Sequence, residues 1–394
     1  MSLEGLRLTL HFDPPIPAGI VGDVRETISY AWERIRSHEM AADGGSATIE
    51  LVDESDAPEA ERRVRAIVSA MSKRQPAVER SVVYEHRLPA RYTGAIDGEL
   101  AASGAVAMQQ PGLATLAGAA FEVIEALDRR FLAMATDVFG AKAHHYPSMI
   151  AKASLDRIRY FESLAYHATF AFSLREDMPS ILNVSNDVIP IDSPPFLELL
   201  RQPAQILTPA LCYNTYVYFQ DRPLDEPTAI TARGRCFRYE SRNMATLERL
   251  WEFDMREIVF LGPKEWVEER RQMAVRATAR LVEELELDAW VETANDPFFM
   301  NNFAARRFFQ LASQTKYELR LSLPYADGRS LAAASFNLHL DYLGKSFGIA
   351  RDDGFAYTGC VGFGFERWVW ALFAQLGPRV EGWPKSVRAA LGLA

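Results

Sequence analysis

The stretch Gly359-Cys360-Val361-Gly362-Phe363-Gly364-Phe365-Glu366-Arg367 decides how this chain is expected to fold. Residues 357–362 are strand-like and residues 365–376 have the pattern of a buried helix, so the stretch spans a strand-to-helix turn. Its three glycines would let the backbone come close to a ligand at that turn. Arg367 falls in the first turn of the helix. Taken alone, a glycine-rich strand end is weak evidence for a binding site.

A second stretch with chemical content is Gly234-Arg235-Cys236-Phe237-Arg238-Tyr239-Glu240. On a strand, Arg238 and Glu240 point to the same face because they are two positions apart. A planar guanidinium can clamp a phosphate with two hydrogen bonds. The alternative is a cross-strand ion pair on a solvated sheet, which this stretch alone favours.

The third stretch is Arg249-Leu250-Trp251-Glu252-Phe253. Phe253 could stack on a flat base, and Arg249 could reach a terminal phosphate. The alternative is a core aromatic residue beside a surface arginine, and either interpretation is open from these residues.

Three further residues form a candidate zinc site: Cys212, Glu257 and Cys360. Two thiolates and one carboxylate would leave the fourth tetrahedral position open, as a catalytic zinc site requires. The ligands are 45 and 103 residues apart, which is not a zinc signature. For any single cysteine, the alternative is a buried apolar thiol.

Taken in chain order, the three stretches resemble motifs 2 and 3 of the class II aminoacyl-tRNA synthetases, most nearly the seryl branch. Within that branch the chain resembles the truncated homologues called amino acid:[carrier protein] ligases, over about residues 95–394. Residues 208–213, 296–299, 335–339 and 347–349 carry this likeness. It implies an α+β fold with a class II synthetase-like antiparallel sheet flanked by helices.

The resemblance also implies a metal site. These ligases are similar to the methanogen-type seryl enzymes in binding zinc through Cys, Glu and Cys, and Cys212, Glu257 and Cys360 fall at the matching positions. The zinc would take the α-amino group of a small amino acid as its fourth ligand.

ATP, with Mg²⁺, is the second cofactor that the resemblance implies. Arg238 would act catalytically on the α-phosphate, and Arg249 would hold the γ-phosphate. Glu240 would face the adenine or its neighbouring phosphate. Phe253 would stack on the adenine, with Arg367 on the other side.

The expected function is therefore a ligase that forms an aminoacyl-adenylate and passes the acyl group to the phosphopantetheine thiol of an acidic carrier protein. The helix predicted at 263–286 and the segment 301–310, with Arg306 and Arg307, are candidates for docking that carrier. Two alternatives stay open: an atypical, methanogen-like seryl-tRNA synthetase, with tRNA the less favoured partner, and a catalytically silent paralogue that binds a partner or senses an amino acid.

The chain departs from the family pattern at two points. Leu164-Ala165 stands where motif 1 usually has Phe-Pro at the dimer interface, although a homodimer is still expected. No glutamate lies near Arg329, where the synthetases place one for magnesium, so the Mg²⁺ ligands are open.

The chain divides into two expected domains. Residues 1–90 are expected to form a small α/β module of unknown role, with strands at 6–12, 47–52 and 81–88 and helices at 21–36 and 58–73. Residues 95–394 would form the catalytic domain. Its strand-like stretches follow one another with few helices between them, which indicates a mostly antiparallel sheet. These stretches are 169–173, 215–219, 229–239, 256–261, 317–323, 331–337 and 357–362.

The composition excludes several classes of protein. A net charge of −9 over 394 residues predicts no large basic surface and no DNA partner. No apolar run reaches the 18 or so residues of a membrane span. An odd, small number of cysteines, three, argues for a reducing cytoplasm rather than a disulfide framework.

Overall fold

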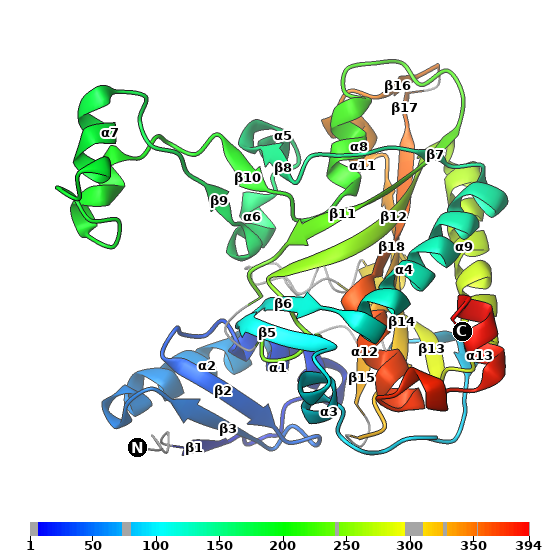
Figure 1. The fold of residues 1–394 in the computed structure, drawn as a ribbon, viewed down its shortest axis with the longest axis horizontal. Coiled ribbons are helices and arrows are strands. Elements are labelled where there is room, and N and C mark those ends of the chain that lie inside the picture. The colour runs from blue at the N-terminus through cyan, green and yellow to red at the C-terminus, as the bar shows by residue number, and fades with distance from the viewer. Residues whose placement is uncertain are drawn as a thin grey trace.

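The computed structural model describes residues 7–72, 80–240, 244–295, 310–325, 329–352 and 354–393. Among these residues a sheet of eight strands runs through the body of the molecule (Figure 1), in the order β4-β13-β14-β15-β18-β12-β11-β7. Every neighbouring pair is antiparallel except β11 and β7, so the expected α+β class is confirmed. The strands are β4 (Val82–His86), β7 (Lys142–Ala143), β11 (Thr228–Phe237), β12 (Glu252–Gly262), β13 (Ala289–Thr293), β14 (Lys316–Ser322), β15 (Ser330–Leu340) and β18 (Tyr357–Gly364).

Helices cover one face of this sheet, and part of the other face lines a cavity. Successive side chains on a strand point to opposite faces. On β18, Val361 and Phe363 accordingly lie in the apolar core, whereas Cys360 and Gly362 line the cavity. The covering helices are α4 (Gly118–Ala133), α9 (Lys264–Glu284), α12 (Phe365–Leu376) and α13 (Lys385–Leu391).

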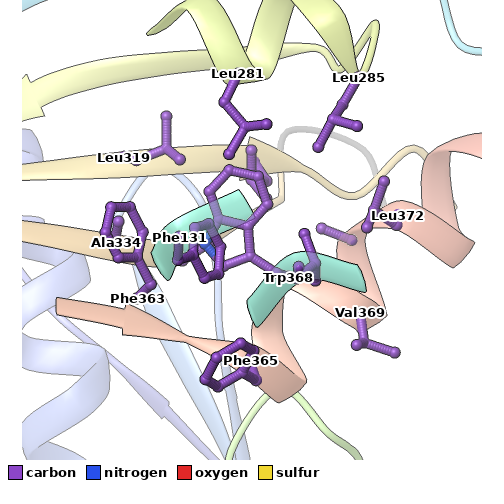
Figure 2. Packing of buried hydrophobic residues seen from close by; sticks show 14 of the residues in the cluster. Phe131, Leu281, Leu285, Leu319, Ala334, Phe363, Phe365, Trp368, Val369 and Leu372 are labelled. Atoms are coloured by element: carbon purple, nitrogen blue, oxygen red, sulfur yellow. The ribbon is translucent and has the colours of Figure 1, made fainter. Parts of the chain in front are cut away.

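Aromatic packing fixes the turn from β18 into α12 (Figure 2). The ring of Phe131 stacks on Phe363 with 4.2 Å between centroids, and Trp368 meets Phe131 edge-on at 5.4 Å. All three side chains are fully buried. Truncating a side chain of this size in a core typically costs about 3–5 kcal/mol. The turn that presents Arg367 is thus held by the packing behind it.

The N-terminal residues form a separate small sheet, β1-β3-β2, with its own core beneath two helices. The helix expected over 21–36 is partly wrong, because α1 ends at Ile28 and a strand follows. That strand pairs with β3, so sheet pairing overrides the local helical pattern. The strand expected at 81–88 is β4, which joins the large sheet instead; the domain boundary near residue 90 stays a prediction. The elements are β1 (Arg7–His11), α1 (Val21–Ile28), β2 (Ile35–Met40), β3 (Ser46–Leu51) and α2 (Ala57–Ser72).

Residues 215–219, expected as a strand, lie in helix α8 (Cys212–Tyr218), so that expectation is wrong. Cys212 and Tyr216, four residues apart, are both buried in one apolar cluster, which a helical period allows. A short run of tyrosine, threonine and valine resembles a strand when this packing is not known.

The remaining elements connect these parts. A three-stranded sheet, β8-β10-β9, leads to the projecting helix α7 (Figure 1). The motif 1-like residues lie at α6, and the expected dimer stays a prediction. Among the described residues we find no helix whose length and hydropathy would suit a membrane span. These elements are α3 (Asp97–Ala102), β5 (Val106–Gln110), β6 (Leu113–Leu116), β8 (Met149–Ala151), α5 (Lys152–Arg157), α6 (Phe161–Leu164), β9 (Phe170–Ala171), α7 (Met178–Ser185), β10 (Gln205–Leu207), α11 (Tyr342–Ser346), β16 (Ala350–Arg351) and β17 (Gly354–Phe355).

Candidate active site and metal centre

The structure brings Cys212, Glu257 and Cys360 together as a trio. One ligand atom from each lies within 4.8 Å of the other two. Glu257 on β12 and Cys360 on β18 project from the cavity face of neighbouring strands. Cys212 begins α8, and its backbone N–H donates to Glu257 Oε2 at 2.8 Å. Regular elements therefore hold all three ligands, although the sequence separates them widely.

The chemistry of the trio fits a divalent metal. The three residues are only 3–6% exposed. Burial and the neighbouring Cys360 raise the pKa of Glu257 to about 7. A hydrogen bond between the two sulfurs raises the pKa of Cys212 and lowers that of Cys360. Three acidic groups thus crowd a buried site, and a soft cation with tetrahedral geometry, such as Zn²⁺, suits two thiolates and a carboxylate.

A second group of predicted site residues, the cation wall, consists of Arg238, Arg249, Arg367 and the central Glu240. Arg249 Nε lies 3.7 Å and Arg367 Nη2 3.8 Å from Glu240 Oε2. Arg238 Nε donates to the carbonyl of Pro209 at 2.8 Å. Arginine side chains from separate parts of the chain therefore converge on one carboxylate.

The charge of Glu240 is compensated within this wall. Burial opposes its ionisation, but the surrounding cations hold its pKa below the ordinary value. These cations are Arg367, Arg249, His167 and Arg238. A wall that already balances one buried carboxylate with several cations has the electrostatics to accept a polyphosphate.

Phe253 differs from the other ATP candidates because it is not among the cavity-lining residues. It is half-buried on β12, and the guanidinium carbon of Arg238 lies 5.4 Å from its ring centroid. Its stacking on adenine stays a prediction.

One cavity of about 1740 Å³ joins the trio to the cation wall. Sequence reasoning missed its third side, which is formed by Arg25, Tyr30 and His38 of the N-terminal module. The ring of Tyr30 contacts that of Tyr166 edge-on, with 4.9 Å between centroids. Asp23 also ties the module to the body, because its Oδ1 lies 3.4 Å from Arg80 Nη2. Nothing in the local sequence signals a contact between residues so far apart.

Two carboxylates near the expected magnesium position line the cavity, Glu318 on β14 and Glu248. Glu318 lies 3.2 Å from Lys316 Nζ, and Glu248 pairs with Arg329. Both are thus engaged by cations here. Arg329, which stands where the family has a glutamate nearby, serves to neutralise Glu248.

The segment expected to dock a carrier protein, residues 301–310 with Arg306 and Arg307, lies outside the described residues apart from Gln310, and so do residues 296–299. The helix expected at 263–286 is α9, which buries one face against β15 and β18.

Comparison with known proteins now defines the class. The serine–tRNA ligase of Methanococcus maripaludis, a type-2 enzyme, is 29% identical over 259 residues, 63% of this chain and 50% of that protein. The type-2 enzyme of Methanopyrus kandleri is 29% identical over 283 residues, 67% of this chain and 54% of its own length. The chain thus spans about half the length of these curated relatives. No family model matches it.

The solved structures agree on the fold. The M. kandleri SerRS, crystallised in complex with A. aeolicus tRNASec, superposes with a TM-score of 0.72 at 23% identity. The match covers 98% of this chain, and therefore most of residues 1–90, and 77% of that one. A cytoplasmic serine-tRNA ligase from Naegleria fowleri in complex with AMP gives 0.62 at 12% identity, covering 86% and 72%. The fold of this chain is thus class II aminoacyl-tRNA synthetase-like, and the curated relatives named above are type-2 serine–tRNA ligases.

These findings correct the expected acceptor. The prediction that the chain passes its acyl group to a carrier protein is wrong, and so is the preference for that partner over tRNA. The relatives are tRNA ligases, and most of the N-terminal residues align with a tRNA ligase structure.

Proposed function

We propose that this chain activates a small amino acid with ATP, serine being the candidate that its relatives indicate, and transfers the aminoacyl group to a tRNA. The observation that carries the proposal is the meeting of the trio and the cation wall in one cavity. An adenylate has an amine at one end and a phosphate at the other, so it needs both groups.

The cation wall would serve the first step. A carboxylate oxygen of the amino acid attacks the α-phosphorus of ATP, a new O–P bond forms, and pyrophosphate leaves with the electrons of the broken bond. Positioning and charge neutralisation dominate such a step. Arg238, held by the Pro209 carbonyl, would stabilise charge at the α-phosphate. Arg249 and Arg367 would exchange Glu240 for phosphate oxygens.

The trio would serve recognition of the amino acid. A zinc ion bound there would supply a Lewis-acid position for the substrate's α-amino group. Buried walls around the trio, including Tyr216 and Met255, restrict the room beside it. Small amino acids are therefore favoured, because a closely packed wall excludes larger side chains.

The size of the cavity supports a large second substrate. Small-molecule sites usually occupy roughly 300–1,000 Å³, whereas this cavity measures about 1740 Å³. The cavity lining reaches the N-terminal module at Arg25, Tyr30 and His38, and we propose that the end of an acceptor enters there. The relatives support a tRNA as that acceptor.

Amino-acid-dependent exchange of pyrophosphate into ATP tests the activation step. We expect exchange with serine or another small amino acid and none with large ones; no exchange with any of the twenty would contradict the proposal. Charging of total tRNA with the activated amino acid then tests the acceptor. Pyrophosphate exchange without formation of acid-precipitable aminoacyl-tRNA would contradict the proposed transfer to tRNA but not the activation step.

A further inference from the structure

His339 lies beside the trio without being one of its ligands. Its Nε2 is 3.9 Å from Cys360 Sγ. Asn337 Nδ2 donates to the same sulfur at 3.5 Å. The sulfur of Cys360 therefore has two nitrogen neighbours on β15, in addition to its contact with Cys212.

A β-bulge aims His339 at this sulfur. Along the β15–β18 ladder, Leu338 pairs with Gly359 and Leu340 pairs with Thr358, so His339 is the extra residue. Leu340, which follows, has a left-handed φ of 53°, an uncommon conformation for leucine. Bulges are frequent next to active sites, where they redirect a side chain. Without the bulge, the alternation of the strand alone would set the direction of residue 339.

Buried hydroxyl groups hold the other side of the imidazole. Tyr216 Oη lies 3.3 Å and Thr358 Oγ1 3.4 Å from His339 Nδ1. Tyr216 and Thr358 are fully buried. A buried tyrosine hydroxyl needs an acceptor, and Nδ1 provides one when the ring carries its proton on Nε2. That tautomer leaves Nε2–H directed at Cys360 Sγ.

We propose that His339 is a positioning residue that orients Cys360 Sγ toward the metal, with Tyr216 fixing the tautomer of the ring. The inference rests on the proposed metal site. Groups that hydrogen-bond to metal ligands restrict their orientation, and losing one typically weakens metal affinity about 10–100-fold. Asn337 supplies a second donor, so His339 tunes the site rather than creating it.

The experiment compares zinc and cobalt binding by the wild-type chain with His339→Leu, His339→Gln and Tyr216→Phe. We expect His339→Leu to weaken zinc binding about 10–100-fold in competition with a chromophoric chelator, and to shift the thiolate-to-cobalt charge-transfer band. His339→Gln keeps an N–H donor near the position of Nε2 and should restore most of the affinity and the band. The zinc affinity of Tyr216→Phe should lie between those of His339→Leu and His339→Gln. His145→Gln changes an exposed histidine outside the cavity and serves as the matched control.

The outcomes separate this inference from the metal site itself. Wild-type protein that binds neither metal would overturn both. Tight binding in the wild type with an unchanged affinity and cobalt spectrum in His339→Leu would overturn the positioning role alone. If His339→Leu does not fold, Tyr216→Phe decides: a shifted cobalt band in Tyr216→Phe beside a near-wild-type band in His339→Gln supports the inference, and an unchanged band in Tyr216→Phe overturns it.

Discussion

The two halves of the cavity are built differently. Each ligand of the trio sits on a regular element and is at most 6% exposed. In the cation wall, Arg249 and Arg367 keep 26% and 33% of their side chains exposed, and their contacts with the Glu240 carboxylate are long, at 3.7 and 3.8 Å. Backbone carbonyls of Glu248 and Ala332 also accept hydrogen bonds from Arg367. The trio is therefore preorganised for one small ion, whereas the wall keeps partly exposed cations around a carboxylate that a phosphate can replace. Variants in the cation wall should therefore leave metal binding by the trio intact, whereas loss of the metal should also abolish the overall reaction.

The largest effect is expected from Cys360→Ser. A serine hydroxyl is a poor substitute for a thiolate ligand, so zinc and pyrophosphate exchange should be lost together. Metal analysis and the exchange assay measure the two losses. Cys236→Ser provides the control, because Cys236 is equally buried but lies outside the trio. Stoichiometric zinc in Cys360→Ser would remove that residue from the site.

Arg238→Ala should impair the cation wall and with it the activation step. We expect pyrophosphate exchange to fall about 10²–10³-fold, the usual loss when one preorganised charge-stabilising donor is removed. The zinc content should stay at the wild-type value. Arg235→Ala, on β11 three residues before Arg238 and half exposed, is the matched control. A parallel loss of zinc in Arg238→Ala would show that the two halves are not independent.

Glu366→Gln should change how stability depends on pH. Burial raises the pKa of Glu366 to about 7, while its carboxylate accepts the backbone N–H of Asp254. Because the folded-state pKa exceeds the unfolded value, the stabilising contribution is complete below about pH 4.5 and is lost as the pH rises through 7. As the pH rises from about 4.5 to 7, the free energy of unfolding of the glutamine variant should therefore increase relative to that of the wild type, by up to roughly 3 kcal/mol. Chemical denaturation at pH 5 and pH 8 measures the difference, and equal differences at both would contradict the shift.

Phe253→Leu is expected to have the smallest effect. If the ring stacks on adenine, losing it should raise KM for ATP about two- to tenfold with little change in kcat, since such stacking contributes about 0.5–1.5 kcal/mol. Leucine keeps the apolar packing of Phe253 with its neighbours. An unchanged KM would instead identify Phe253 as a core aromatic, in line with its place outside the cavity lining.

The sequence allowed prediction of what depends on local pattern. The strand-to-helix turn before Arg367 and helix α12 follow from glycine spacing and an apolar run, and both lie where expected. Helix α8 was predicted as a strand, because its buried face is defined only by packing against other elements. The side of the cavity built by Arg25, Tyr30 and His38 had no sequence signal, since domain packing sets it. The prediction of a carrier protein as acceptor was wrong for the same reason. Local motifs describe the activation step, whereas the acceptor contacts surfaces assembled from residues that are distant in the sequence.

We propose that Cys212, Glu257 and Cys360 hold a zinc ion that binds the amine of the substrate. An anomalous difference map at the zinc edge tests this most directly, from crystals of the wild-type chain grown with serine and a non-hydrolysable ATP analogue. We expect one strong peak within about 2.0–2.4 Å of Cys212 Sγ, a Glu257 carboxylate oxygen and Cys360 Sγ, with the serine amine as its fourth neighbour. No peak between these residues, or a fourth ligand supplied by the protein itself, would contradict it.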